Sequence, residues 1–217
     1  NIFGKLMWLK ASSVYVTHKA GYDVIFQDAD LIWLRNPILH LQSSKHDVAF
    51  MDDGARSTRF TPFFVNSGFY YIKNEPSSSK YFMELMLKSG PSEIDVTHSH
   101  QAVLTRHMME AHHLANLQID ILNTELFPSG ALYHNNKTYI NEIINYQKFP
   151  YVFHMCWTTN RDDKVKYFKE LGFWFLPVGS NTDGTSNLEC SNPASMLSWV
   201  KNEKNNHRNS DIRDKCC

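Results

Sequence analysis

The chain has 217 residues, a length that can bury a sizeable core and is ordinary for one domain. Its 22 Lys and Arg residues balance its 22 Asp and Glu residues, so no broad positive field would attract nucleic acid or an anionic membrane. No apolar run approaches the roughly 20 residues that span a bilayer, and residues 1–20 do not have the form of a signal peptide.

The first part of the chain predicts one helix followed by strands. The expected elements are a helix over residues 3–19 and strands over residues 23–27, 47–51 and 68–73. Gly21 provides a stop for the helix. The apolar run of the first strand is typical of a strand buried in a parallel sheet. Residues 31–37 are expected to leave regular structure, because Pro37 interrupts it.

The second part of the chain predicts alternating helices and strands. The expected elements are helices over residues 77–90, 98–113 and 161–172 and strands over residues 117–122 and 151–155. This alternation with mostly short links predicts an α/β fold. From residue 178 onwards Gly, Ser, Asn and charged residues dominate, so we expect a domain over residues 1–177 and an irregular tail over residues 178–217.

Cysteines and a glycosylation sequon favour a lumenal setting. If all the cysteines are oxidised, three pairings are open among Cys156, Cys190, Cys216 and Cys217. The sequon at residues 136–138 lies in an expected polar loop and would accept an N-glycan in a secretory protein. The chain also begins inside an amphipathic segment without an initiator Met, so we expect a fragment that lacks its native N-terminus and any anchor on it.

Two carboxylates, Asp28 and Asp30, follow the first expected strand. In open α/β sheets the ligand crevice lies at the carboxyl ends of the strands. The repulsion between two carboxylates that project from one turn is relieved by a divalent cation with hard oxygen ligands, such as magnesium or manganese, which a substrate phosphate would also bind. The alternative is that Asp28 caps a turn and Asp30 is solvated.

The segment around these residues, DVIFQDADLIWLRNP, resembles the DxD segment of the nucleotide-diphospho-sugar transferase family, which includes plant cell-wall xylosyl- and arabinosyltransferases. Further segments similar to the family follow in order: VNSGFYYIKN at 65–74, HQAVLT at 100–105, LNTELFPSGALYH at 122–134 and FHMCWTTNRDDKVKYFKELGFW at 153–174. The resemblance covers roughly residues 4–176, and this ordered set is far more specific than one DxD.

The resemblance implies a GT-A type glycosyltransferase with a Rossmann-like three-layer sandwich and a mixed sheet, of which the usual first strand and helix are missing here. It implies transfer of a hexose or pentose, with retention, from a nucleotide-diphosphate donor, expected to be a UDP-sugar, to a glycan or glycoprotein. It also implies a divalent metal, expected to be manganese, held by Asp30 and His154, with Asp28 at the ribose or the metal's water. A cation that neutralises the diphosphate would ease its departure.

Further site residues are expected from the same resemblance. Asn66 would lie against the donor sugar, and its alternative is a turn with Ser67 and Gly68. Lys164 would meet the diphosphate as a point charge or be a surface lysine. The remaining expected site residues are Lys10, which matches another family lysine, Gln101, which the family retains, and Asp52 and Asp53, which would bind sugar hydroxyls or lie in a solvated loop.

The sequence departs from the family at His100, which stands where Asp precedes Gln101. That Asp would orient the donor or face the acceptor, so a catalytically inactive protein that binds a sugar nucleotide or glycan is an alternative function. A zinc site is a further alternative, for which the ligands would be His98, His100, His112 and His113. Helical spacing spreads these side chains around the axis, and no Cys is nearby in sequence.

A phosphatase of the haloacid dehalogenase type also places Asp-x-Asp after an apolar strand. That chemistry uses the first Asp as nucleophile and usually has Thr or Val two positions beyond the second, where Ile32 stands here.

The family resemblance also implies a location. It implies a protein of the Golgi lumen, held by a type II membrane anchor that is not in this chain.

Overall fold

The computed structural model describes residues 2–55 and 64–175. The helices are α1 (Ile2–Lys19), α2 (Ile38–Ser43), α3 (Ser77–Thr97), α4 (His100–Ala115), α5 (Gly130–Asn135), α6 (Lys137–Ile144) and α7 (Arg161–Glu170). The strands are β1 (Val24–Gln27), β2 (Leu31–Trp33), β3 (Val48–Asp52), β4 (Val65–Ile72), β5 (Ile119–Leu122) and β6 (Val152–His154). The expected α/β class is therefore confirmed. The tail expected over residues 178–217, with three of the cysteines, lies outside the described residues.

Four strands form one mixed sheet in the order β1-β4-β3-β5. The pairs β1–β4 and β3–β4 are antiparallel, and the pair β3–β5 is parallel. The prediction that the first strand lies inside a parallel sheet is wrong, because β1 pairs antiparallel with β4 and stands at the end of the strand order. A short apolar run signals burial but carries no information about the direction of its partner.

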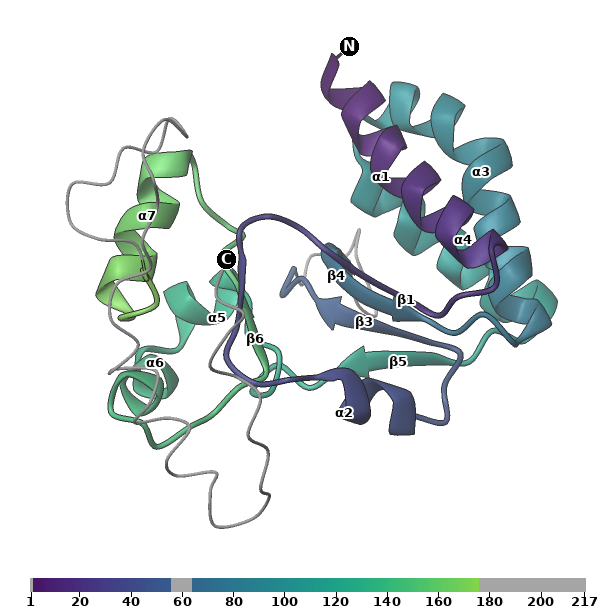
Figure 1. The fold of residues 1–217 in the computed structure, drawn as a ribbon. Coiled ribbons are helices and arrows are strands. Elements are labelled where there is room, and N and C mark those ends of the chain that lie inside the picture. Colours follow the sequence, from purple (N-terminus) through teal and green to yellow (C-terminus); the bar gives the residue numbers. More distant parts are fainter. Residues whose placement is uncertain (1, 56–63, 176–217) are drawn as a thin grey trace.

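Helices α1, α3 and α4 cover one face of this sheet (Figure 1). Their buried side chains join those of the strands in one hydrophobic cluster, which includes Val14, Phe82 and Met108. Together with the sheet they form what we call the sheet region. The expected stop of the second helix at residue 90 is wrong, since α3 continues through Pro91 to Thr97. This extension buries Ile94 in the same cluster, and that burial offsets the hydrogen bond that proline removes.

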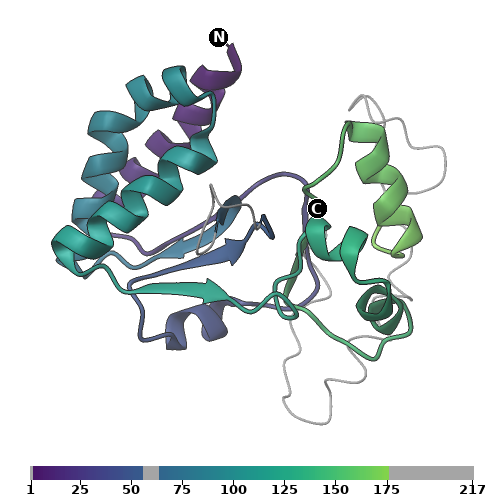
Figure 2. The same cartoon turned by 180° about the vertical axis from the view of Figure 1, so that it is seen from behind.

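The short strands β2 and β6 pair antiparallel, and helices α5, α6 and α7 lie on the side of these strands away from the four-stranded sheet (Figure 2). We call this part the ladder region. Its core contains Ile143, Phe153 and Phe168, and Ile32 packs against it. The expectation that residues 31–37 leave regular structure is therefore wrong for Leu31–Trp33. Three residues carry too little local signal, and their strand exists because of a partner far along the chain.

The other face of the sheet lies against α2 and against residues from the ladder region. Leu41 of α2, Phe127 and Val152 of β6 share one buried cluster with side chains of β3 and β4.

The glycosylation sequon at residues 136–138 was expected in a loop, and this prediction is wrong. Asn136 caps α6, because its side chain accepts a hydrogen bond from the Tyr139 backbone N–H at 3.0 Å.

Candidate functional site

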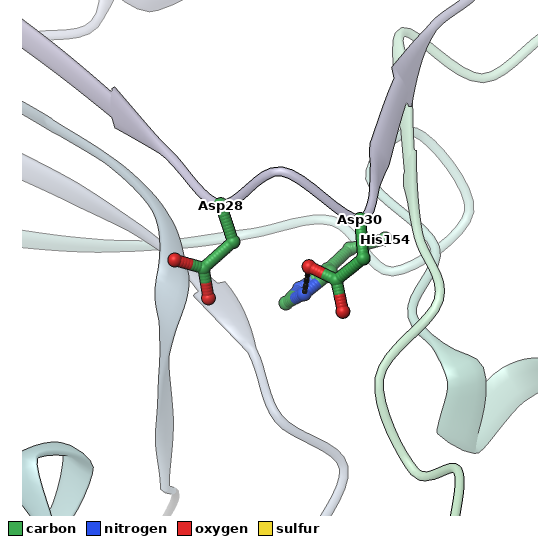
Figure 3. Close-up of side chains that lie close together, drawn as sticks. All are labelled: Asp28, Asp30 and His154. Carbon is green, nitrogen blue, oxygen red and sulfur yellow. Dashed lines mark ion pairs between the residues drawn. The ribbon is translucent and has the colours of Figure 1, made fainter. Parts of the chain in front are cut away.

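The loop of residues 28–30 connects the sheet region to the ladder region. The Asp28 backbone N–H donates to the Gly68 carbonyl oxygen in β4 at 2.8 Å. The Asp30 carbonyl oxygen accepts from the backbone N–H of Met155, directly after β6, at 3.1 Å. Both ends of the loop are therefore fixed, and both carboxylates extend from the same side of it beside His154 (Figure 3).

Each of the two carboxylates has its own lysine. Asp28 Oδ1 lies 2.6 Å from the Nζ of Lys10, which α1 supplies. Asp30 pairs with Lys164 of α7 through Oδ2, and its Oδ1 lies 3.2 Å from the Nε2 of His154. Lys164, for which a surface position was the alternative, thus contacts the Asp30 carboxylate directly.

The Asp30 carboxylate is held in its ionised form. Burial acts to raise the pKa of Asp30, but the hydrogen bonds and charges of His154 and Lys164 outweigh it and hold this pKa well below its ordinary value. Asp30 therefore carries its negative charge throughout the neutral range, as a metal ligand requires.

The residues fit a divalent cation. One ligand atom each of Asp28, Asp30 and His154 lies within 4.8 Å of the others. Two carboxylates and an imidazole suit manganese or magnesium, which prefer hard ligands. Gly68 keeps the space open, because a Cβ there would lie 2.3 Å from His154 Cε1 and 2.8 Å from Asp28 Oδ2. Such contacts are shorter than van der Waals packing allows.

Asn66 of β4 makes hydrogen bonds to Asp53 and Gly68 and so forms a second polar group beside the metal ligands. Its Nδ2 donates to Asp53 Oδ1 at 2.9 Å, and its Oδ1 accepts from the Gly68 backbone N–H at 2.8 Å. The ladder between β3 and β4 is irregular here, since Met51 pairs with Asn66 after Phe50 has paired with Tyr70. Such irregularities are frequent beside functional sites, because they change the direction of a side chain.

The remaining expected site residues lie around this group. Gln101 Oε1 accepts from the Ser67 backbone N–H at 3.0 Å and from the Ser67 hydroxyl at 3.3 Å, so that α4 supports the irregular part of β4. Asp52 Oδ1 accepts from the Gly54 backbone N–H at 2.8 Å. Asp52 and Asp53 are both buried, and this differs from the solvated loop that the sequence left open.

His100 lies at the start of α4 and is almost fully buried, with an exposed fraction of 3%. Within the described part of the chain, neither ring nitrogen has a hydrogen-bond partner. Burial, and behind it the nearby charge of Lys10, lowers the pKa of His100 to about 4. His100 is therefore neutral at pH 7 and carries neither a positive charge nor the negative charge of the Asp that the resemblance led us to expect at this position.

A cavity of about 530 Å³ opens on the ladder-region side of Asp30. Its lining residues are Ala29, Asp30, Thr158, Thr159, Asn160, Arg161 and Lys164. The Thr158 hydroxyl itself is buried and has no partner among the described residues. The cavity thus offers a lysine beside the candidate metal ligands.

Some contacts at the site were not foreseen from the sequence. A Cβ on Gly130 would lie 1.7 Å from the Cys156 carbonyl oxygen, so only glycine lets α5 approach the segment after His154. The signal was present in the family-like segment LFPSG, but its partner is distant in sequence. Among the described residues Cys156 is a free thiol, and burial raises its pKa to about 12. The three cysteines with which the sequence left its pairing open lie outside the described residues.

The histidines expected for a zinc site do not come together. Over residues 2–55 and 64–175, the group of His, Cys, Asp and Glu ligands found close enough to share a metal is Asp28, Asp30 and His154. His112 Nδ1 instead lies 2.8 Å from the Leu117 carbonyl oxygen.

Among the helices of residues 2–55 and 64–175, none has the length and apolar character needed to cross a bilayer.

The sequence is similar to those of known proteins. The sequence model of the nucleotide-diphospho-sugar transferase family matches residues 2–168, more than half of the chain. UDP-D-xylose:L-fucose alpha-1,3-D-xylosyltransferase 3 of Arabidopsis thaliana is 28% identical over 174 residues, which cover 72% of this chain and 43% of that protein. A beta-arabinofuranosyltransferase of Arabidopsis thaliana is 25% identical over 187 residues, which cover 79% of this chain and 34% of that protein.

A protein of an organism other than Arabidopsis thaliana is also similar. UDP-galactose:fucoside alpha-3-galactosyltransferase of Dictyostelium discoideum is 25% identical over 177 residues, which cover 73% of this chain and 26% of that protein. The chain therefore spans less than half the length of each of these relatives.

Proposed function

The chain belongs to the nucleotide-diphospho-sugar transferase family, and on this premise we propose that it is a metal-dependent glycosyltransferase. It transfers a hexose or a pentose from a UDP-sugar to a glycan or glycoprotein acceptor. The observation that carries the proposal is the convergence of Asp28, Asp30 and His154 beside Lys164. Membership of this family favours sugar transfer over the phosphatase activity that the Asp-x-Asp pattern alone had left open.

Asp30 and His154 would hold the cation, expected to be manganese, and Asp28 would face the ribose or the metal's water. When bound, the cation supplies positive charge that neutralises the diphosphate leaving group. Lys164, which pairs with Asp30, would donate to a phosphate oxygen of the donor.

Asn66 and Asp53 would orient the donor sugar. Their mutual hydrogen bond fixes both side chains, and a carboxylate still has lone pairs to accept sugar hydroxyls. Asp52, at the end of β3, would also bind hydroxyls of the donor sugar. Gln101 is a positioning residue in this account, because its Oε1 is occupied by Ser67. Lys10 would orient Asp28 through their ion pair.

Finer features of the proposal rest on the family. We propose a GT-A-like fold, transfer with retention at the anomeric carbon, and a Golgi lumenal location. Of the relatives, one is named for an L-fucose acceptor and one for a fucoside. We therefore propose a fucosyl residue as the first acceptor to try.

The experiment that tests the proposal is calorimetric titration of UDP with and without manganese. The full chain should bind UDP with manganese and bind it far more weakly without. Asp30→Ala should abolish the manganese-dependent part, whereas Asp95→Asn, an exposed acid on α3, should leave it unchanged. Metal-independent binding that survives Asp30→Ala would contradict the proposal.

Turnover separates an enzyme from a binding protein. A screen of UDP-sugars with a fucoside acceptor, with products analysed by NMR, should give one transferred sugar whose anomeric configuration is retained. UDP binding without transfer or donor hydrolysis would support the inactive alternative suggested by His100.

A further inference from the structure

Trp157 has an unusual backbone conformation beside the site. Its φ is 59°, in the left-handed region that bulky residues rarely adopt. Trp157 is also 48% exposed. A residue of this size usually buries most of its surface. Such backbone conformations persist only where surrounding contacts hold them, and they are frequent at ligand sites.

Contacts at both ends of the residue hold this conformation. The indole Nε1–H donates to the Asp53 carbonyl oxygen at 2.9 Å. The Trp157 carbonyl oxygen lies 3.0 Å from His134 Nε2, which donates to it. The preceding residue, Cys156, is fixed by the close approach of Gly130. The indole is therefore a rigid aromatic surface, ordered before any ligand arrives.

A short series of contacts leads from Trp157 to the candidate metal site. Trp157 contacts Asp53, and Asp53 accepts from Asn66 at 2.9 Å. Asn66 accepts from Gly68, and a Cβ on Gly68 would lie 2.3 Å from His154. Trp157 thus directly contacts Asp53, the residue that is paired with Asn66.

The contact with Asp53 indicates which ligand the indole meets. In the proposed function, on which this inference rests, the ribose is at Asp28, the diphosphate at the cation and the donor sugar at Asn66 and Asp53. The next group beyond the donor sugar is the acceptor. A uracil base would instead be attached to the ribose, on the side of Asp28 and Lys10.

We propose that Trp157 forms the acceptor subsite and stacks on the apolar face of a pyranose of galacto configuration, as in a fucoside. The axial O4 of such a sugar leaves the hydrogens of C3, C4 and C5 together on one face. These weakly positive C–H groups match the negative face of an indole ring. A sugar with an equatorial O4 has no face of this kind, so the subsite discriminates between the two.

The test is titration of methyl α-L-fucopyranoside into the full chain, with and without saturating UDP and manganese, followed by indole fluorescence and calorimetry. The fucoside should bind and change the emission, and methyl α-D-glucopyranoside should bind more weakly. Trp157→Ala should weaken fucoside binding about tenfold. Trp157→Phe should retain most of the affinity and lose the emission change, and the UDP affinity should stay the same in both variants.

Tyr146→Ala is a matched control. Tyr146 also has a left-handed backbone, with φ of 57°, and is 46% exposed, but it follows α6. This variant should bind both sugars as the unchanged chain does. The inference is overturned if the unchanged chain does not bind the fucoside, if Trp157→Ala binds it equally well, or if Trp157→Ala instead loses UDP affinity. Failure of the unchanged chain to bind UDP would refute the proposed function, whereas the titration without UDP still reports on Trp157.

Discussion

The sheet region and the ladder region each hold one carboxylate of the site, and they hold it differently. In the sheet region, Asp28 has one charged partner, Lys10, at 2.6 Å. In the ladder region, Asp30 has two, His154 and Lys164, and their combined effect keeps its pKa far below the ordinary value. The comparison teaches that a donor bound at both carboxylates would join two regions, which also share the buried cluster of Phe127 and Val152.

The largest expected effect separates the two carboxylates. Asp30→Asn should weaken manganese-dependent UDP binding more than a hundredfold, because it removes a metal ligand, whereas loss of an outer-shell contact costs 10- to 100-fold. Asp28→Asn should cost about tenfold, since this residue faces the ribose or a metal-bound water. Calorimetry on both variants measures how far each one weakens UDP binding in the presence of manganese. Equal weakening in the two variants would contradict the different roles of Asp30 and Asp28.

A second prediction concerns the buried histidine of the sheet region. The pKa of His100 is lowered by burial from its ordinary 6.5 to about 4, so the folded protein binds this proton less readily than the unfolded chain. The stability that this provides is fully present above pH 6.5 and declines as the pH falls toward 4. Between pH 7 and pH 5 the loss is about 2 kcal/mol.

Urea unfolding of His100→Leu measures this loss. The variant should lack the His100 part of the pH dependence between pH 7 and pH 5. His113→Asn, a change at an exposed histidine on α4, should retain it. An identical pH dependence in His100→Leu and the unchanged chain would show that His100 is not the group that titrates.

A third prediction tests the contact between the two regions at Gly68. Gly68→Ala would place a Cβ 2.3 Å from His154 Cε1, so the two regions would have to move apart. Overpacking of this kind costs roughly 2 kcal/mol, and metal-dependent UDP binding should fall with it. Gly4→Ala is the control, because its nearest contact would be an ordinary 3.6 Å. Urea unfolding compares the two variants, and equal stabilities would contradict the crowding of the site.

The smallest expected effect distinguishes the two lysines. Lys164→Ala should raise the dissociation constant for UDP about tenfold, which is the loss of one charge-assisted contact of about 1.4 kcal/mol. Lys10→Ala should raise it less, because Lys10 acts through Asp28. Titration at two salt concentrations checks the charge contribution, since an interaction with the diphosphate weakens as salt is raised. A larger effect at Lys10 would place the diphosphate in the sheet region.

Local signals in the sequence were sufficient for part of this site. An apolar run ending in Asp28 and Asp30 predicted a strand followed by acids, and β1 and the loop after it have that form. The resemblance of VFHMCW to the family selected His154, which lies beside Asp30.

Contacts between distant segments could not be read in the same way. The strand Leu31–Trp33 depends on pairing with β6, and the helix through Pro91 depends on the burial of Ile94. The need for glycine at position 68 arises from His154, far along the chain. The left-handed backbone of Trp157 likewise depends on Asp53 and His134, which no local pattern connects to it.

The central claim is that Asp30 and His154 of the ladder region hold one cation, while Asp28 of the sheet region faces the ribose or the metal's water. Electron spin echo envelope modulation of the manganese complex with UDP tests it most directly, because the method detects a nitrogen bound to the metal. The account predicts an imidazole nitrogen signal in the unchanged chain and its loss in His154→Gln. Absence of this signal in the unchanged chain, or its survival in His154→Gln, would contradict the account.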